Sequence, residues 1–292
     1  MAKPESPLTR TLFFILLPGL FFLSVNNVTA AGIDDADAIP HVGERARATY
    51  QQVFLPADKH RAFAIAPGGG WAWSSGKATA DEAGKAAVEE CQKHTAQRCM
   101  AYAVDDTLVF SREQWGKLWG PYKTAEQAAA AGSGTQVGER FPDIAFTSAD
   151  GQDQSIAGLR GKVVLVHFWG SWCPPCLREL PTLDTLHRIL RDKTGDDVAL
   201  VLLQLREPIS SARDWARQQG FAGLPLADSG ASGEDDAFLV TTAGEQIPDR
   251  VLARLFPSSY VLDRYGIVLF SHTGPVQDWT EYLPFFEDAA TE

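Results

Sequence analysis

The sequence predicts an α/β fold for its second half and a small α+β domain ahead of it. In the second half, a buried strand over 163–168, a helix over 175–191 and a strand over 198–205 follow one another. This alternation predicts a core built on parallel strands. Earlier in the chain, alternating apolar residues over 61–66 run into a turn at 68–70, which is typical of a hairpin.

The N-terminal α+β domain is predicted over 32–123. Before position 59 the chain lacks sustained periodicity, so neither a helix nor a strand is predicted there. After the glycine turn we expect a return strand over 71–75, a helix over 80–93, and strands over 100–104 and 107–110. Thr79 and Glu82 fit a capping box at the start of that helix. This pattern resembles a domain of unknown function that is found in secreted bacterial proteins.

Residues 1–31 have the features of a cleaved signal peptide. Lys3 and Arg10 precede an apolar run that closes on small residues. The alternative is an N-terminal membrane anchor, but Pro18 and Gly19 interrupt the run, and a span needs about 20 apolar residues. A cleaved signal predicts a periplasmic or otherwise extracytoplasmic protein, in which disulfides are permitted.

The stretch 124–140 is predicted to be a linker, because it is rich in small and turn-forming residues. The α/β domain is therefore placed at 141–292. Its remaining expected elements are a helix over 211–219, a strand over 224–227, a long polar segment over 228–250, a hairpin of strands over 259–262 and 267–272, and a closing helix after 278.

The charge of the chain excludes one class of partner. The formal net charge is −11, and no basic cluster is present. Binding to nucleic acid depends on Lys and Arg side chains that displace counterions from phosphates. We therefore expect no nucleic-acid partner.

A Trp-Cys-Pro-Pro-Cys motif lies between the strand over 163–168 and the following helix. Two cysteines in one helical turn can form a disulfide, and a helix N-terminus favours a thiolate. Cys173 is predicted to be exposed and to attack, and Cys176 to be more buried and to resolve the mixed disulfide. Trp172 would shelter the Cys173 sulfur. The competing interpretations are a permanent disulfide and half of a zinc site; we expect no metal and no cofactor.

The segment Lys162-Val-Val-Leu-Val-His-Phe-Trp-Gly-Ser-Trp-Cys-Pro-Pro-Cys-Leu-Arg-Glu-Leu-Pro181 closely resembles the TlpA/ResA-like branch of the thioredoxin superfamily. The segments 141–143 and 159–162 match the N-terminal hairpin of that branch, and 256–263 matches its cis-proline strand. The resemblance covers about 141–286. It implies a thioredoxin-like fold with an N-terminal hairpin.

The resemblance also implies roles for single residues. Pro257 would form a cis peptide bond facing the cysteine pair, and Phe256 would shape substrate access. Glu179 stands where this branch has a glutamate linked to cysteine acid–base behaviour, although an exposed glutamate early in a helix is also favourable with the helix dipole. His167 departs from the branch, which often has asparagine there. It is either a satisfied core histidine or a relay for the Cys176 proton.

A second cysteine pair lies in the N-terminal domain. Cys91 and Cys99 stand at the end of the predicted helix and the start of the next strand, so a structural disulfide between them would close a short loop. His94 lies between them, but three ligands without a fourth make a metal site the weaker interpretation.

The function that these features predict is an extracytoplasmic thiol–disulfide oxidoreductase. The resemblance implies a reductase of disulfide-containing protein substrates that takes electrons from a membrane thiol–disulfide electron donor, often in apocytochrome c maturation. The alternative is a partner-binding or targeting protein in which the thioredoxin-like domain is only a scaffold.

Overall fold

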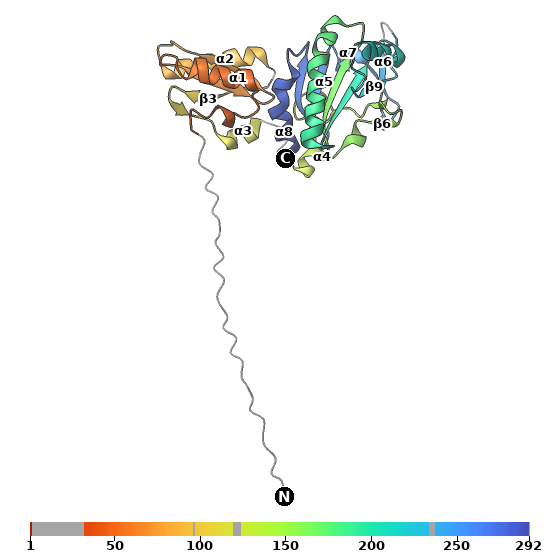
Figure 1. Cartoon of the computed structure of the whole chain (residues 1–292), viewed down its shortest axis with the longest axis horizontal. Coiled ribbons are helices and arrows are strands. Elements are labelled where there is room, and N and C mark those ends of the chain that lie inside the picture. Colours follow the sequence, from red (N-terminus) through yellow and green to blue (C-terminus); the bar gives the residue numbers. More distant parts are fainter. Residues whose placement is uncertain (2–31, 96, 119–123, 234–236, 292) are drawn as a thin grey trace. The chain divides into compact units, whose positions relative to one another are not determined.

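The computed structural model describes Met1 and residues 32–95, 97–118, 124–233 and 237–291 of the 292-residue chain. The predicted signal peptide therefore lies outside the described residues, apart from Met1. From Gly32 onward the described chain forms one compact unit, which contains a four-stranded and a seven-stranded sheet (Figure 1).

The N-terminal region is an antiparallel sheet with helices. Its elements are α1 (Glu44–Thr49), a π-helical turn (Tyr50–Phe54), β1 (Ala62–Ala66), β2 (Gly70–Ser74), α2 (Ala80–His94), β3 (Met100–Val104), β4 (Thr107–Leu108) and α3 (Arg112–Leu118). The strand order is β2-β1-β3-β4. Helix α1 and the π turn lie before position 59, where no element was predicted. Their buried residues Ala46, Tyr50 and Phe54 are four apart, as on one helical face, but the pattern covers only about two turns.

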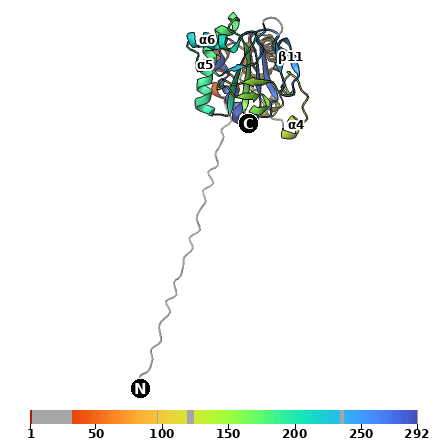
Figure 2. The same ribbon diagram turned by 90° about the vertical axis from the view of Figure 1, so that its right-hand side faces the viewer.

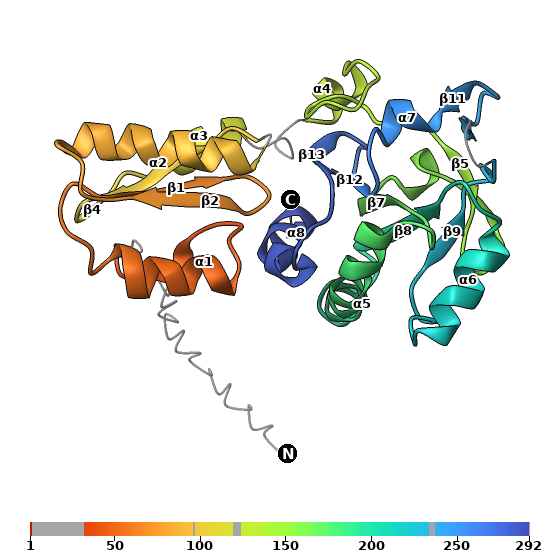
Figure 3. The same cartoon turned by 90° about the horizontal axis from the view of Figure 1, so that it is seen from above.

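Strand β1 is buried on both faces, because successive side chains point to opposite sides of a sheet. Phe63 and Ile65 belong to one apolar core with Tyr50 and Phe54. The three alanines of β1 instead pack with Ala83, Ala87 and Cys91 of α2. Figure 3 shows α1 and α2 on opposite faces of this sheet. The small side chains of one face let α2 approach closely.

The capping box of α2 is present in a shifted form. Thr79 Oγ1 accepts a hydrogen bond from Glu82 N at 3.2 Å, and Glu82 Oε2 accepts from Ala78 N rather than from Thr79 N. At its other end, α2 is tied to the start of β3 by a Cys91–Cys99 disulfide.

The C-terminal region has an α/β fold with a mixed sheet, as the sequence predicts. Its elements are β5 (Ala145–Thr147), β6 (Asp153–Ser155), β7 (Val163–Trp169), α5 (Pro174–Thr194), β8 (Val198–Gln204), α6 (Ile209–Gln218), β9 (Leu226–Asp228), β10 (Phe238–Val240), β11 (Gln246–Pro248), α7 (Asp249–Leu252), β12 (Ser258–Leu262), β13 (Val268–Thr273) and α8 (Leu283–Thr291). The strand order is β13-β12-β7-β8-β9-β5-β6. Strands β7, β8 and β9 are parallel, whereas β5–β6 and β12–β13 form antiparallel hairpins.

The central strand β7 is completely buried, since both faces of the sheet are covered. Val163, Leu165 and Trp169 pack in one core with the leucines of α5, whereas Val164 and Val166 pack on the other side with the β5–β6 hairpin. Figure 2 shows α5 and α6 on the same side of the sheet. Because side chains alternate along a strand, position 167 also faces α5.

The segment predicted as a linker contains ordered structure. Helix α4 (Ala125–Ala129) begins with a complete capping box between Thr124 and Gln127. Gly138 N donates to Val268 O at 2.8 Å, so part of the segment lies along β13. The domain boundaries themselves stay a prediction.

Candidate active site

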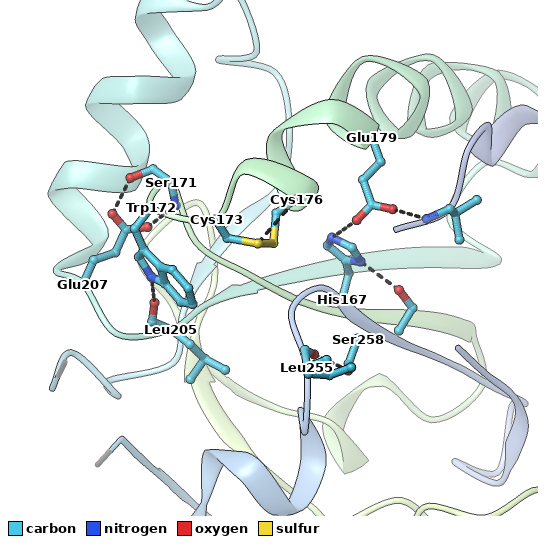
Figure 4. The surroundings of a disulfide bond; sticks show 12 residues. His167, Ser171, Trp172, Cys173, Cys176, Glu179, Leu205, Glu207, Leu255 and Ser258 are labelled. Carbon is cyan, nitrogen blue, oxygen red and sulfur yellow. Dashed lines mark hydrogen bonds and ion pairs between the residues drawn. A yellow bond between two sulfur atoms is a disulfide. The ribbon is translucent and has the colours of Figure 1, made fainter. Parts of the chain in front are cut away.

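The Cys173–Cys176 disulfide lies where β7 ends and α5 begins (Figure 4). Cys173 is the N-cap residue, and its Sγ accepts a hydrogen bond from Cys176 N at 3.3 Å. Pro174 and Pro175 fill the first helical positions, where a missing N–H is tolerated. They also leave Cys176 N as the first amide of the helix that can donate to the sulfur.

The prediction that Cys173 is exposed was wrong. Its side chain is 3% exposed, and Cys176 is 0% exposed. Trp172, which precedes Cys173, is instead 43% exposed. The indole ring carries the accessible surface here, so a partner would meet Trp172 before it reaches the sulfur.

The loop before the cysteines is fixed by residues that follow β8. Trp172 Nε1 donates to Leu205 O at 2.8 Å. Ser171 donates from both its backbone N–H and its hydroxyl to the two carboxylate oxygens of Glu207. Glu207 therefore holds the residue two positions before Cys173, a role that no local pattern in the sequence predicts.

The Phe256–Pro257 peptide bond is cis. Pro257 directly precedes β12, which pairs with β7 so that Ser258 lies opposite Phe168 and Ser259 opposite His167. The Phe256 ring meets the Trp172 ring edge to face, with 5.1 Å between centroids. The strand pairing thus brings residues 84 positions apart together at one edge of the disulfide.

Behind the disulfide lies a buried polar group on the side of the sheet that faces α5. His167 Nε2 and Glu179 Oε1 are 3.2 Å apart, an ion-pair distance whose geometry is not that of a hydrogen bond. His167 Nδ1 lies 2.9 Å from Ser259 Oγ. Figure 4 shows Glu179 pointing from α5 toward His167, with Cys176 on the same helix.

Glu179 is 1% exposed, so its interpretation as an exposed, dipole-stabilised glutamate was wrong. Its Oε2 accepts hydrogen bonds from Val276 N at 2.8 Å and from Trp279 Nε1 at 3.1 Å. These bonds satisfy one carboxylate oxygen with fixed donors and leave Oε1 toward His167. A buried carboxylate with this arrangement needs charged or polar neighbours to offset its desolvation.

His272 is a second histidine near this group. It lies opposite Ser259 in β13, as His167 does in β7. Burial lowers the pKa of His272, and the charge of Glu179 opposes that shift. Neither Ser259 nor His272 was among the predicted site residues. Polar residues inside two apolar strands were the available signal.

Within the described ranges no group of three or more His, Cys, Asp or Glu side chains could hold a metal ion. In the same part of the chain no helix is both long and apolar enough to cross a membrane.

Comparison with known proteins follows the same division of the chain. The Redoxin family matches residues 136–282. The chain belongs to the Redoxin family. It is 36% identical to the thiol-disulfide oxidoreductase ResA of Geobacillus kaustophilus over 138 residues, which are 47% of this chain and 70% of that protein. It is 26% identical to the thioredoxin-like protein YneN of Bacillus subtilis over 156 residues, covering 53% of this chain and 81% of that one.

Among solved structures, StoA from Bacillus subtilis is similar with a TM-score of 0.36 and 22% identity, over 52% of this chain and 99% of that chain. The Redoxin region is thus the ResA-like, thioredoxin-like part expected from the sequence. The protein is a thioredoxin-like thiol–disulfide oxidoreductase. The matches to these relatives span about half of the chain and leave the N-terminal region uncharacterised.

Proposed function

We propose that this redoxin is an extracytoplasmic reductase of protein disulfides. The observation that carries the proposal is the meeting of a helix-capping Cys173, a buried Cys176 and the cis-Pro257 strand at one edge of the sheet. This end of the sheet places the buried Cys173 sulfur next to the exposed Trp172 and the cis-Pro257 segment, where an extended substrate would dock. A thiolate at such a position is stabilised by the helix N-terminus.

In the proposed cycle, the Cys173 thiolate attacks one sulfur of a substrate disulfide. A mixed disulfide forms, and the first substrate thiolate leaves and takes up a proton. The Cys176 thiolate then attacks Cys173 Sγ and releases the second substrate thiolate. The chain is left as the Cys173–Cys176 disulfide, and the substrate has gained two electrons. A membrane dithiol donor would return the chain to its dithiol form by the same exchange.

Trp172 and Phe256 have the substrate-facing roles in this proposal, since their rings border the disulfide and Trp172 is accessible. His167 and Glu179 are proposed to accept and return the Cys176 proton. The proposal is supported by their shared burial between α5 and β7 and by the hydroxyl of Ser259, which can either donate to or accept from His167.

The extracytoplasmic location rests on the predicted signal peptide, and the reductase direction on the resemblance of the segment over 162–181 to the TlpA/ResA-like branch. Maturation of apocytochrome c is the process that the family resemblance suggests. The observed pairing of the two cysteines favours an active pair over a scaffold, because a scaffold would not need them at a helix cap.

The decisive measurement is the reduction potential of the Cys173–Cys176 pair, together with insulin reduction by the full chain. We expect turnover and a potential near that of thioredoxin, about −270 mV, rather than near about −120 mV, the value of a strong oxidant. A potential near about −120 mV would instead make the protein an oxidant that forms disulfides in its substrates. Negligible insulin reduction, equal to that of Cys173→Ala, would favour the partner-binding alternative.

A further inference from the structure

The polar segment over 228–250, for which the sequence suggested no role, contributes to the rim of the active site. It contains the β10–β11 hairpin and leads into α7. Asp249, at the start of α7, is 2% exposed and accepts hydrogen bonds from Arg206 Nε at 2.6 Å and Arg206 Nη2 at 3.0 Å. This bidentate ion pair fastens the segment to the chain just after β8.

Two guanidinium groups lie over Phe256, the residue before the cis-proline. One belongs to Arg206, which pairs with Asp249, and the other to Arg250, which follows Asp249 in the chain. The guanidinium carbons of Arg206 and Arg250 lie 5.6 and 5.4 Å from the centroid of the Phe256 ring. Both distances are within the range of a cation–π contact. Phe256 also contacts the Trp172 ring, so the arginines belong to the surface that borders the disulfide.

The charges of this surface do not cancel. Arg206 and Asp249 cancel each other in charge, whereas the Glu207 carboxylate is hydrogen-bonded by Ser171, which carries no charge. Arg250 and Arg254 are exposed, and neither is in an ion pair within the part of the chain that the structure describes. Arg250 Nη1 instead donates to Arg254 O at 2.9 Å. Among the described residues, Arg250 and Arg254 therefore place exposed positive charge at and near Phe256, in a chain whose net charge is −11.

An exposed apolar side chain directly follows each of these arginines along the chain. Val251 is 59% exposed and Leu255 is 62% exposed, so both differ from the buried Leu252 and Ala253. We name the set Trp172, Arg250, Val251, Arg254, Leu255 and Phe256 the arginine rim. It combines accessible apolar surface with two exposed arginines that form no ion pair with any described residue.

We propose that the arginine rim selects protein disulfides in which acidic side chains flank the cysteine within an extended, partly apolar segment. This inference rests on the proposed function and names its substrate class. Opposite charges across an interface steer encounter and suppress wrong partners. Surface charges are screened beyond about 10 Å at 0.1 M salt. The charges of the rim, rather than the net charge of the chain, therefore determine the electrostatic energy of a segment that docks at the disulfide.

An anionic membrane is the less suitable occupant. Recognition of anionic lipid usually takes clusters of about four to eight Lys and Arg. In the described ranges the rim has only two arginines outside ion pairs, and one of them lies over Phe256, the residue before the cis-proline.

The test uses three synthetic peptides, each closed by one internal disulfide and identical except for Glu, Gln or Lys on both sides of one cysteine. The full chain is reduced in advance, and the second-order rate of peptide reduction is measured at low and high salt. We expect the Glu peptide to react about five-fold faster than the Gln peptide at low salt, and the Lys peptide slowest. The preference should shrink at high salt.

Arg250→Gln with Arg254→Gln should remove the preference for Glu, and Arg250→Glu with Arg254→Glu should reverse it. The matched control is Arg98→Gln with Arg191→Gln, which makes the same charge change at two exposed positions, one of them in the last turn of α5. This control should keep the preference. Circular dichroism and thermal unfolding check that each variant is folded.

Equal rates for the three peptides would overturn the inference and leave the proposed function standing. No reduction of any peptide, together with no reduction of insulin, would instead show that the proposed function fails. Flotation with phosphatidylglycerol vesicles is the remaining arm. Binding that depends on Arg250 and Arg254, without a peptide preference, would assign the rim to a membrane and overturn the inference.

Discussion

Two disulfides lie in different surroundings within this chain. Cys91 comes near the end of α2, is completely buried, and packs against the alanines of β1. Cys173 caps the start of α5, beside an exposed Trp172 and the cis-Pro257 strand. A disulfide at the end of a helix cross-links two elements, whereas one at a helix start has amides directed at its sulfur.

Two buried histidines, His41 and His167, also differ in their surroundings, here in the hydrogen-bond partners of their rings. His41 Nδ1 accepts from Gly68 N at 3.2 Å, which can only donate, and so Nε2 must carry the proton that it shares with Asp288 Oδ2 at 2.8 Å. His167 Nδ1 meets the Ser259 hydroxyl, which can donate or accept. The first ring is held in one neutral tautomer. The second can carry its proton on either nitrogen, as a relay requires.

The largest expected effect separates the two disulfides by activity. Cys173→Ser should lower insulin reduction more than about 100-fold, because it removes the attacking thiolate. The double variant Cys91→Ala with Cys99→Ala should stay within about two-fold of the wild type, since this pair does not border the active site. Comparable losses in both variants would mean that the N-terminal disulfide takes part in turnover.

The second effect separates them by stability. Removing the Cys91–Cys99 disulfide should lower the free energy of unfolding by about 2–3 kcal/mol, the value for closing a short loop. Urea unfolding followed by circular dichroism measures it. A change below about 0.5 kcal/mol would show that α2 and β3 hold together without the cross-link.

The sequence predicts most directly those residues of the site that lie close together along the chain. Cys173 and Cys176 are neighbours in one helical turn, so their spacing reveals them. Glu207, which follows β8, lies 36 residues from its partner Ser171. Ser259 of β12 lies 92 residues from its partner His167. Their importance depends on which strands pair and in which register, which a single sequence with one apolar pattern per strand does not specify.

The segment over 228–250 shows the same dependence on contacts between distant parts of the chain. The segment over 228–250 is polar and follows no period, so it was expected only as a long polar stretch. Its structure depends on contacts with distant parts of the chain, among them the buried ion pair between Asp249 and Arg206, which lie 43 residues apart. Neither residue is unusual in its local sequence, and so only the folded chain shows the pair.

The third effect is the pH dependence of stability that His41 creates. Burial lowers the pKa of His41, and its bond to Asp288 only partly opposes that shift. Below about pH 6.5 the unfolded chain therefore binds a proton that the folded chain does not, and stability should fall as the pH falls from 7 to 5. His187 and His272 have pKa values shifted the same way and add to the slope.

His41→Gln isolates the contribution of one ring, because its amide can still donate to Asp288 but does not titrate in this range. The difference in unfolding free energy between pH 7 and pH 5 should be smaller in this variant than in the wild type. Parallel pH curves for the two proteins would show that His41 does not contribute.

The smallest effect is the most informative about the contrast between the histidines. If His167 relays the Cys176 proton, His167→Asn should shift the pH dependence of thiol–disulfide exchange, because asparagine keeps a polar side chain but cannot carry a proton between sites. The measurement is the rate of exchange with a small disulfide from pH 5 to 9. His41→Gln is the matched control and should keep the wild-type profile. An unchanged profile in His167→Asn would make His167 a buried structural histidine like His41, and would leave Glu179 as the group to test next.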